Sequence, residues 1–288
     1  MNSLGLKGYY QGAYCGGYGL VVAEDNGENQ TGFGMQYNLK YCTLNPEKIG
    51  KEAGERAVRL LGAKSVPSQK ATLILEPYIA TNFLGIISPA LSAEAADKGK
   101  SFLKDKLNKK VASNLLTLID DGQMPGRILS APFDGEGVPT SKTTLVEEGV
   151  LKSYLHNTYT AHKAGLQSTG NGIRGSYKST PEIGTTNFYL EKGTLDPQQM
   201  IKEVEKGLYV TDVMGMHTAN PISGDFSLGA SGIWIEKGEL KYPVRGIAIA
   251  GNIEQLLENI DGVGNDLTFF VGKGSPTIRI NNISISGS

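Results

Sequence analysis

Glycine content is the feature that most constrains how this chain can fold. Glycine accounts for 38 of the 288 residues, and it shows no three-residue period, which excludes a collagen-like triple helix. This abundance, together with 13 tyrosines, is typical of a sheet-rich protein with many turns and bulges. Hydrophobic residues make up 39% of the chain, which is enough to bury a core and excludes a disordered or fibrous protein.

The charge balance and the few cysteines exclude further classes of protein. The 28 basic and 29 acidic residues leave a net charge of -1, whereas nucleic-acid-binding proteins usually carry a basic excess. No apolar run approaches the roughly 18 residues that span a bilayer, and residues 1–10 lack the apolar segment of a signal peptide. Cys15 and Cys42 are too few for a disulfide framework or a four-cysteine zinc site. We therefore predict a cytoplasmic protein that binds neither nucleic acid nor membrane.

The N-terminal quarter has clear local signals. Aromatic and β-branched residues at 14–22 and 33–41 flank Asp25-Asn26-Gly27 and predict a hairpin. A helix should follow over 45–62, because Asn and Pro begin this stretch and Gly ends it. Residues 65–70 have the composition of a linker.

The linker predicts two domains. Residues 1–66 should form part of an N-terminal α/β domain, and residues 67–288 a β-rich domain with a large mixed or antiparallel sheet. The fold class is therefore α+β. Within the second domain we expect the following features: strands at 71–76, 143–146, 150–155, 186–190, 208–213, 233–235, 240–249 and 277–285, helices at 92–110, 196–206 and 252–260, and Gly-rich loops at 167–184 and 223–231.

Residue patterns alone reveal no catalytic centre. The histidines are His156, His162 and His217, and no two of them have the spacing that directs two imidazoles at one metal from a helix. Residues 170–175 match G-x-G-x-x-G, but neither a buried strand before them nor a helix after them supports a dinucleotide site. The simplest interpretation is surface or hydrogen-bonded histidines and a mobile polar loop.

Two further pairs of residues have alternative interpretations. Ser101 and Lys104 fit S-x-x-K, but the motifs that accompany it in known hydrolases are absent, so a helical surface is the more ordinary reading. Asp134 and Glu136 are either paired catalytic acids or, more typically for a Gly-rich loop, acceptors for backbone amides.

Seven segments, taken in order, nevertheless resemble one known family, the TldD/PmbA family, also called modulator of DNA gyrase. The segments are Ser130–Thr140, Leu145–Lys152, Tyr159–Ala161, Ser168–Gly172, Ser223–Ser227, Ile249–Asn252 and Val263–Asp266. Each is weak alone, but the ordered set is specific, and it covers the chain from about Asn2 to its end.

The resemblance implies a cytoplasmic zinc metallopeptidase system of two kinds of subunit. TldD-type subunits carry a His-Glu-x-x-x-His helix and a distant Cys as metal ligands, and PmbA-type (TldE) subunits lack them. At the position of the zinc helix, after the strand at 71–76, this chain has Phe83, Leu84 and Ser88, and residues 269–273 contain no Cys. The resemblance therefore places the chain on the PmbA/TldE side and implies no cofactor on this chain, with zinc only on a TldD-type partner.

The leading hypothesis is a non-catalytic subunit that pairs with a TldD-like metallopeptidase subunit, self-associates as a homodimer in isolation and helps to hold an unfolded peptide. The alternative is an independent peptidase or hydrolase whose metal ligands come from the three histidines and carboxylates. For peptide binding or an interface we single out the glycine-containing loop at 223–231. Its candidate residues are Ser223, Gly224, Asp225, Phe226, Ser227, Gly229 and Ser231. Glycines that only serve sheet bulges are the other interpretation of this segment.

The family normally has a larger N-terminal domain than this chain offers. Residues 2–6 resemble a motif from the interior of that domain. We therefore expect Met1 to begin partway through the family architecture, in a shortened form of a longer protein or a natural short paralogue.

Overall fold

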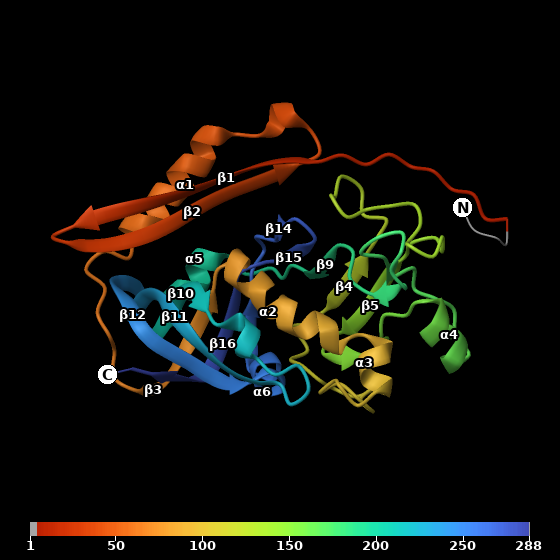
Figure 1. The fold of residues 1–288 in the computed structure, drawn as a ribbon. Helices are drawn as coiled ribbons and strands as arrows, with labels where there is room; N and C mark the ends of the chain where they lie inside the picture. The colour runs from red at the N-terminus through yellow and green to blue at the C-terminus, as the bar shows by residue number, and fades with distance from the viewer. Residues whose placement is uncertain (1–4, 288) are drawn as a thin grey trace.

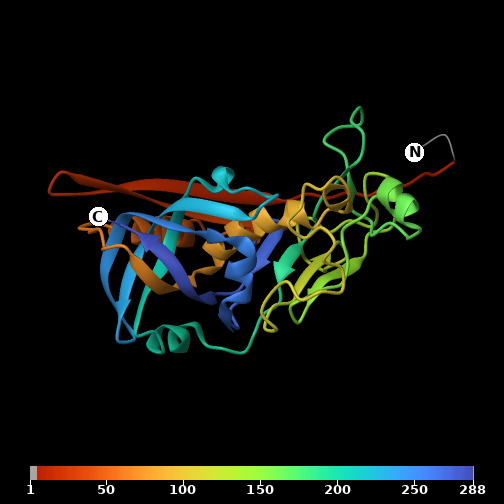
Figure 2. The ribbon, with the colours of Figure 1, turned by 90° about the horizontal axis from the view of Figure 1, so that it is seen from below.

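The structure is a computed structural model that describes residues 5–287. It begins with an extended segment and a long hairpin of β1 (Cys15–Asp25) and β2 (Glu28–Asn38). Asn26 and Gly27 have φ values of 49° and 80°, the left-handed conformations that a tight hairpin turn requires. The predicted hairpin is therefore confirmed. Figures 1 and 2 both show it lying along one side of the molecule, with its turn projecting at one end.

Helix α1 (Pro46–Val58) packs on one face of this hairpin. Asn45 caps the helix as predicted, since its side chain accepts a hydrogen bond from the backbone N–H of Lys48. A Cβ atom on Gly34 would lie 2.0 Å from the carbonyl oxygen of Ile49. Glycine at this point of β2 thus allows the helix backbone to approach the strand directly.

The larger part of the chain contains a six-stranded mixed sheet that closes on itself. Its order is β12-β11-β10-β3-β16-β13, and β12 also pairs with β16, so that five strands form a ring. Strands β3 and β10 are parallel, and the other neighbours are antiparallel. The strands are β3 (Gln69–Leu75), β10 (Lys206–Met214), β11 (Asp225–Glu236), β12 (Glu239–Asn252), β13 (Ile260–Val263) and β16 (Ile278–Ser286).

A second six-stranded sheet lies beside this ring, in the order β14-β15-β9-β4-β5-β6. Its strands are β4 (Leu118–Asp121), β5 (Lys142–Glu147), β6 (Val150–Leu151), β9 (Phe188–Leu190), β14 (Thr268–Phe270) and β15 (Lys273–Ser275). A short pair, β7 (Gly172–Ile173) with β8 (Glu182–Ile183), belongs to the polar loop predicted at 167–184.

Helix α2 (Pro77–Ala90) joins the two sheets, because it contacts β3 and β10 of the ring and β9, β14 and β15 of the second sheet. The remaining helices are short: α3 (Ala93–Asp97), α4 (Thr158–Ala164), α5 (Pro197–Lys202), α6 (Ile253–Glu258) and the 3-10 turns η1 (Tyr41–Thr43) and η2 (Met216–Thr218). The peripheral helices predicted near 196–206 and 252–260 correspond to α5 and α6.

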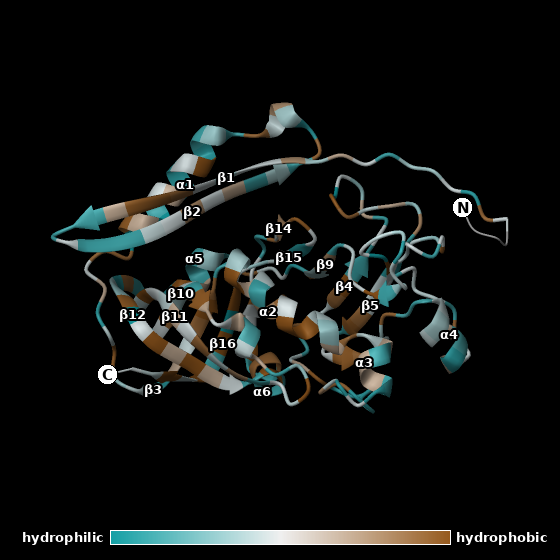
Figure 3. Ribbon diagram, viewed as in Figure 1, coloured by the Kyte–Doolittle hydropathy of each residue, from teal (hydrophilic) through white to brown (hydrophobic). Residues whose placement is uncertain are grey.

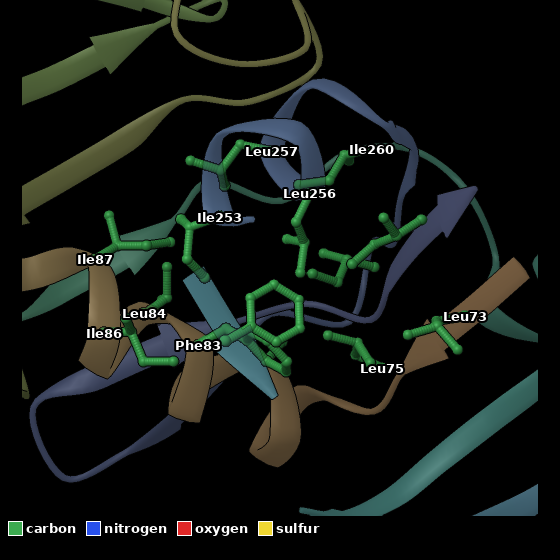
Figure 4. Close-up of a cluster of buried hydrophobic side chains, with 14 of the residues drawn as sticks. Leu73, Leu75, Phe83, Leu84, Ile86, Ile87, Ile253, Leu256, Leu257 and Ile260 are labelled. Carbon is green, nitrogen blue, oxygen red and sulfur yellow. The ribbon is translucent and has the colours of Figure 1, made fainter. Parts of the chain in front are cut away.

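The main core fills the space between α2, α6 and the ring. Phe83, Leu84 and Ile87 of α2 meet Leu256 of α6 there, along with side chains of β3 (Figure 4). Hydrophobic residues concentrate in α2 and the ring strands, whereas the turn of the hairpin is hydrophilic (Figure 3). The mixed, sheet-rich architecture confirms the predicted α+β class.

The helix predicted over 92–110 is wrong. Only α3 is helical, because Gly99 adopts a φ of +68° directly after it, and Asp105 and Asn108 also have positive φ. The apolar side chains of Phe102 and Leu103 are instead buried in an irregular segment.

The proposed boundary near residue 66 stays a prediction. In the part of the chain that the structure describes, no helix is both long and apolar enough to span a bilayer.

Candidate functional site

A cleft with a volume of about 820 Å³ lies along the exposed side of α2. The cleft is enclosed by α2, the end of β2, the stretch around η2, and the connection between β14 and β15, together with Leu129 and the stretch at 185–186. The lining residues include Met35, Tyr37, Tyr78, Thr81, Asn82, Gly85, Ile86, Pro89, Leu129, Thr185, Thr186, Met216, His217, Ala219, Pro221, Phe270 and Lys273. A cleft of this size and mixed chemistry is the default candidate for a ligand site.

Helix α2 has distinct core and cleft sides. Phe83 and Leu84 are 2% and 5% exposed and belong to the core, as Figure 4 shows. Asn82 and Gly85 line the cleft instead. The resemblance had placed Phe83 and Leu84 at the family's metal position, but in this structure they are core residues. Local patterns gave no helix here, although Pro at its first position and the apolar run after it are signals for one.

The hairpin supplies one wall of the cleft and is held by aromatic contacts. The rings of Phe33 and Tyr78 lie 4.8 Å apart, and those of Tyr78 and Phe270 lie 5.2 Å apart. Burial raises the pKa of the Tyr78 phenol. The guanidinium of Arg56 lies over the Phe33 ring, 4.7 Å from its centroid, and over the Tyr78 ring at 5.7 Å. These contacts connect β2, α2 and β14 around one end of the cleft.

A buried ion cluster fixes α1 to the start of α2. Glu76 is 6% exposed, and its carboxylate lies 2.6 Å from the Nη1 of Arg56 and 3.3 Å from the Nη2 of Arg59. Because Glu76 immediately precedes α2, this cluster positions the hairpin and α1 relative to the cleft.

A second buried carboxylate organises the opposite side of the cleft. Asp120 of β4 is 1% exposed. It accepts hydrogen bonds from Asn171 at 2.7 Å and from the backbone and hydroxyl of Thr186 at 2.7 and 2.8 Å. Burial raises the pKa of Asp120, while these hydrogen bonds act in the opposite direction. The network holds Thr186 at the cleft, and Asn171 comes from the loop that matched a dinucleotide motif.

The segment at 223–231 was predicted to be a glycine-containing loop, and this prediction is wrong from Asp225 onward. Residues from Asp225 onward form β11, which pairs with β12 along its length and with β10 from Gly229 to Glu236. Phe226 is 5% exposed and stacks edge-on against Phe83, with 5.8 Å between the ring centroids. Ser231 is also buried, whereas Ser227 is exposed. Most of this segment therefore has its backbone committed to the ring sheet.

The first residues of that segment form a local hydrogen-bond network. The amide of Asn252 donates to the carbonyl of Ser223 at 2.8 Å and to the carboxylate of Asp225 at 2.9 Å. The hydroxyl of Ser223 donates to Asp225 at 2.7 Å, and together these bonds lower the pKa of Asp225. Gly224 turns the chain with a φ of +80°. This hydrogen-bond network connects β11 to the start of α6. A role of these residues in peptide binding or an interface stays a prediction.

Asp134 and Glu136 are acceptors rather than paired acids. Asp134 accepts from the backbone N–H groups of Glu136, Val138 and Gly172. Glu136 accepts from the backbone and hydroxyl of Thr158. Both carboxylates therefore stabilise loops, as the simpler interpretation of the sequence held.

The three histidines lie on separate segments. His156 is buried just before α4, His162 lies in α4, and His217 lines the cleft from η2. Burial lowers the pKa of His156. Within residues 5–287, no three His, Cys, Asp or Glu side chains gather closely enough to hold a metal ion.

Comparison with known proteins decides the family. The family described as PmbA/TldA metallopeptidase C-terminal domain matches residues 68–287, and the corresponding central domain matches residues 1–61. The chain belongs to the PmbA/TldD family. The resemblance noted in the sequence is thereby confirmed.

Individual PmbA/TldD proteins agree with this assignment. Metalloprotease PmbA from Escherichia coli O157:H7 is 33% identical over 248 residues, which cover 86% of this chain and 53% of that protein. A solved structure from Thermotoga maritima, named as a modulator of DNA gyrase, has a TM-score of 0.88 at 36% identity and covers 93% of this chain and 61% of that one. TldE from Thermococcus kodakarensis has a TM-score of 0.86 at 28% identity, covering 95% and 63%. The chain thus spans a little over half of the length of these relatives.

A metallopeptidase family name implies a metal, and the side chains of the cleft do not fit one. Catalytic zinc takes about three nitrogen, oxygen or sulfur ligands from the protein. Among the described residues that line the cleft, His217 is the single imidazole, and none carries a carboxylate or thiol. We therefore derive no catalytic step through a metal on this chain.

Proposed function

We propose that this chain is a PmbA/TldE-like, non-catalytic subunit of a cytoplasmic zinc metallopeptidase system that acts in proteolysis and peptide maturation. One observation carries the proposal: α2 presents Thr81, Asn82, Gly85 and Ile86 to the main cleft rather than metal ligands. In this proposal zinc and hydrolysis belong to a TldD-like partner subunit, and this chain needs no cofactor.

The chemistry of the cleft supports a role in holding an unfolded peptide. Apolar surfaces of Tyr78, Ile86 and Phe270 alternate with polar groups such as those of Asn82 and Thr186. Apolar walls with a few placed polar groups bind a chain without demanding one sequence. The net charge of -1 supports neither nucleic acid nor an anionic membrane as partner.

The association of subunits tests this proposal. Light scattering should find the chain as a homodimer alone and as a heterodimer after mixing with a TldD-type subunit, because the proposed activity needs both kinds of subunit. Cleavage of an unstructured peptide should accompany the heterodimer. A chain that stays monomeric at micromolar concentration and does not bind the TldD-type subunit would contradict the proposal.

A further inference from the structure

The main cleft is lined by one lysine, Lys273 of β15, and by no arginine among the described residues. No Asp or Glu occurs among the described residues that line the cleft, and His217 is the other titratable base there. Within residues 5–287, Lys273 forms no ion pair. An ammonium group in a partly enclosed, acid-free cleft attracts an anion, because less water is present to screen its charge.

The backbone of α2 leaves room for this lysine. Its Cε atom lies 3.9 Å from the place where a Cβ on Gly85 would stand. The stem of Lys273 therefore passes the cleft side of α2 at van der Waals distance. Lys273 is partly buried and is one of the residues that line the cleft.

A neutral donor lies close to this charge. Asn82 precedes Gly85 by three residues, and residues three apart on a helix are neighbours on one face. Its carboxamide lines the cleft and makes no hydrogen bond to another described side chain or backbone group. Thr81, in contrast, already donates its hydroxyl hydrogen to the carbonyl of Tyr78 at 2.7 Å. Lys273 and Asn82 thus form a charged and a neutral donor that are both available to a ligand.

We propose that the cleft binds peptide through a carboxylate, which the ammonium group of Lys273 holds while Asn82 bonds the adjoining peptide backbone. Apolar portions of the ligand contact Tyr78, Ile86 and Phe270. The carboxylate is either the free C-terminus of the peptide or the side chain of an acidic residue, since both present the same group. This inference rests on the proposed function, whose peptide it specifies.

Peptide probes of defined charge test the assignment. Two pairs of fluorescent, unstructured peptides are needed: one pair differs only in a C-terminal carboxylate or amide, the other only in an internal Glu or Gln. Fluorescence anisotropy then measures the Kd for the full chain and for Lys273→Met, which keeps the apolar stem. Lys273→Arg restores the charge, and Lys192→Met removes a charge from an exposed site outside the cleft.

We expect the carboxylate form of one pair to bind about tenfold more tightly than its neutral form, as one charge-assisted hydrogen bond provides. Lys273→Met should abolish that ratio, Lys273→Arg should restore most of it, and Lys192→Met should preserve it. The pair that shows the ratio identifies the source of the carboxylate. Equal binding of charged and neutral peptides, or a ratio that survives Lys273→Met, would overturn this inference alone. No binding of any peptide would overturn the proposed function as well.

Discussion

Replacing Glu76 by alanine should lower the free energy of unfolding by about 3–5 kcal/mol, the usual cost of removing one partner from a buried ion pair. Glu76 is 6% exposed and its carboxylate pairs with Arg56 and Arg59. Its loss removes the ion-pair partner of both guanidinium groups at the start of α2. Denaturant unfolding monitored by circular dichroism measures the change.

Glu55→Ala provides the matched control for this loss. Glu55 lies in α1, next to Arg56, but it faces Lys51 across 3.9 Å in an exposed pair, and such pairs contribute about 0–1 kcal/mol. The variant should therefore unfold like the parent chain. If Glu76→Ala cost no more than Glu55→Ala, the buried cluster would not anchor the hairpin and α1.

Replacing Phe83 by alanine should cost a similar amount, about 3–5 kcal/mol, as is usual for a buried aromatic ring. Phe83 lies among α2, α6 and the ring strands (Figure 4). It is 2% exposed, and its ring centroid lies 5.8 Å from that of Phe226. The transition midpoint in denaturant, with an unchanged slope, reports the loss.

Two further variants separate packing from other effects of this substitution. Phe83→Leu keeps most of the apolar volume and should cost clearly less than Phe83→Ala. Tyr159→Ala removes a ring that is 70% exposed on α4, so its effect should stay within about 0.5 kcal/mol. A tolerant response to Phe83→Ala would mean that this side of α2 faces a ligand rather than the core.

Local sequence signals predicted the elements that begin or turn at a helix-capping residue or a turn sequence. The Asn26-Gly27 turn determined the hairpin, and Asn45, Asp196 and Asn252 cap the helices that were expected after them. In each case a side chain or a turn conformation acts within a few residues, so neighbouring sequence contains the necessary information.

Signals failed where tertiary contacts decide the conformation. Strand β11 contains Gly and Ser at positions that suggested a loop, yet Phe226, Leu228 and Ala230 alternate inward while the strand pairs with β12. That two-residue alternation was the available signal. The pattern around Gly99 suggested one long helix, but a left-handed glycine ends it after α3.

The candidate site was accessible to sequence reasoning only through the family resemblance. The cleft joins residues as distant as Met35, Asn82, Thr186 and Lys273, and no local pattern predicts that assembly. Most of the segment favoured at 223–231 is a strand, with a hydrogen-bonded turn at its start, and its role in peptide binding or an interface stays a prediction. The ordered motifs that identified the family contain residues that hold loops together. Asp134 accepts a hydrogen bond from the backbone N–H of Gly172, and the amide of Asn171 donates to Asp120.

We propose that this chain alone neither retains zinc nor hydrolyses peptide. Elemental analysis after dialysis, combined with an assay on an unstructured peptide, tests this proposal for the chain alone and for the chain with a TldD-type subunit. We expect no stoichiometric zinc and no cleavage for the chain alone. Replacement of His156, His162 and His217 by Ala should leave the activity of the reconstituted pair largely intact. The opposite result would be about one tightly held zinc per chain that is lost, together with hydrolysis, in the histidine variant. That result would contradict a non-catalytic role and favour an independent peptidase.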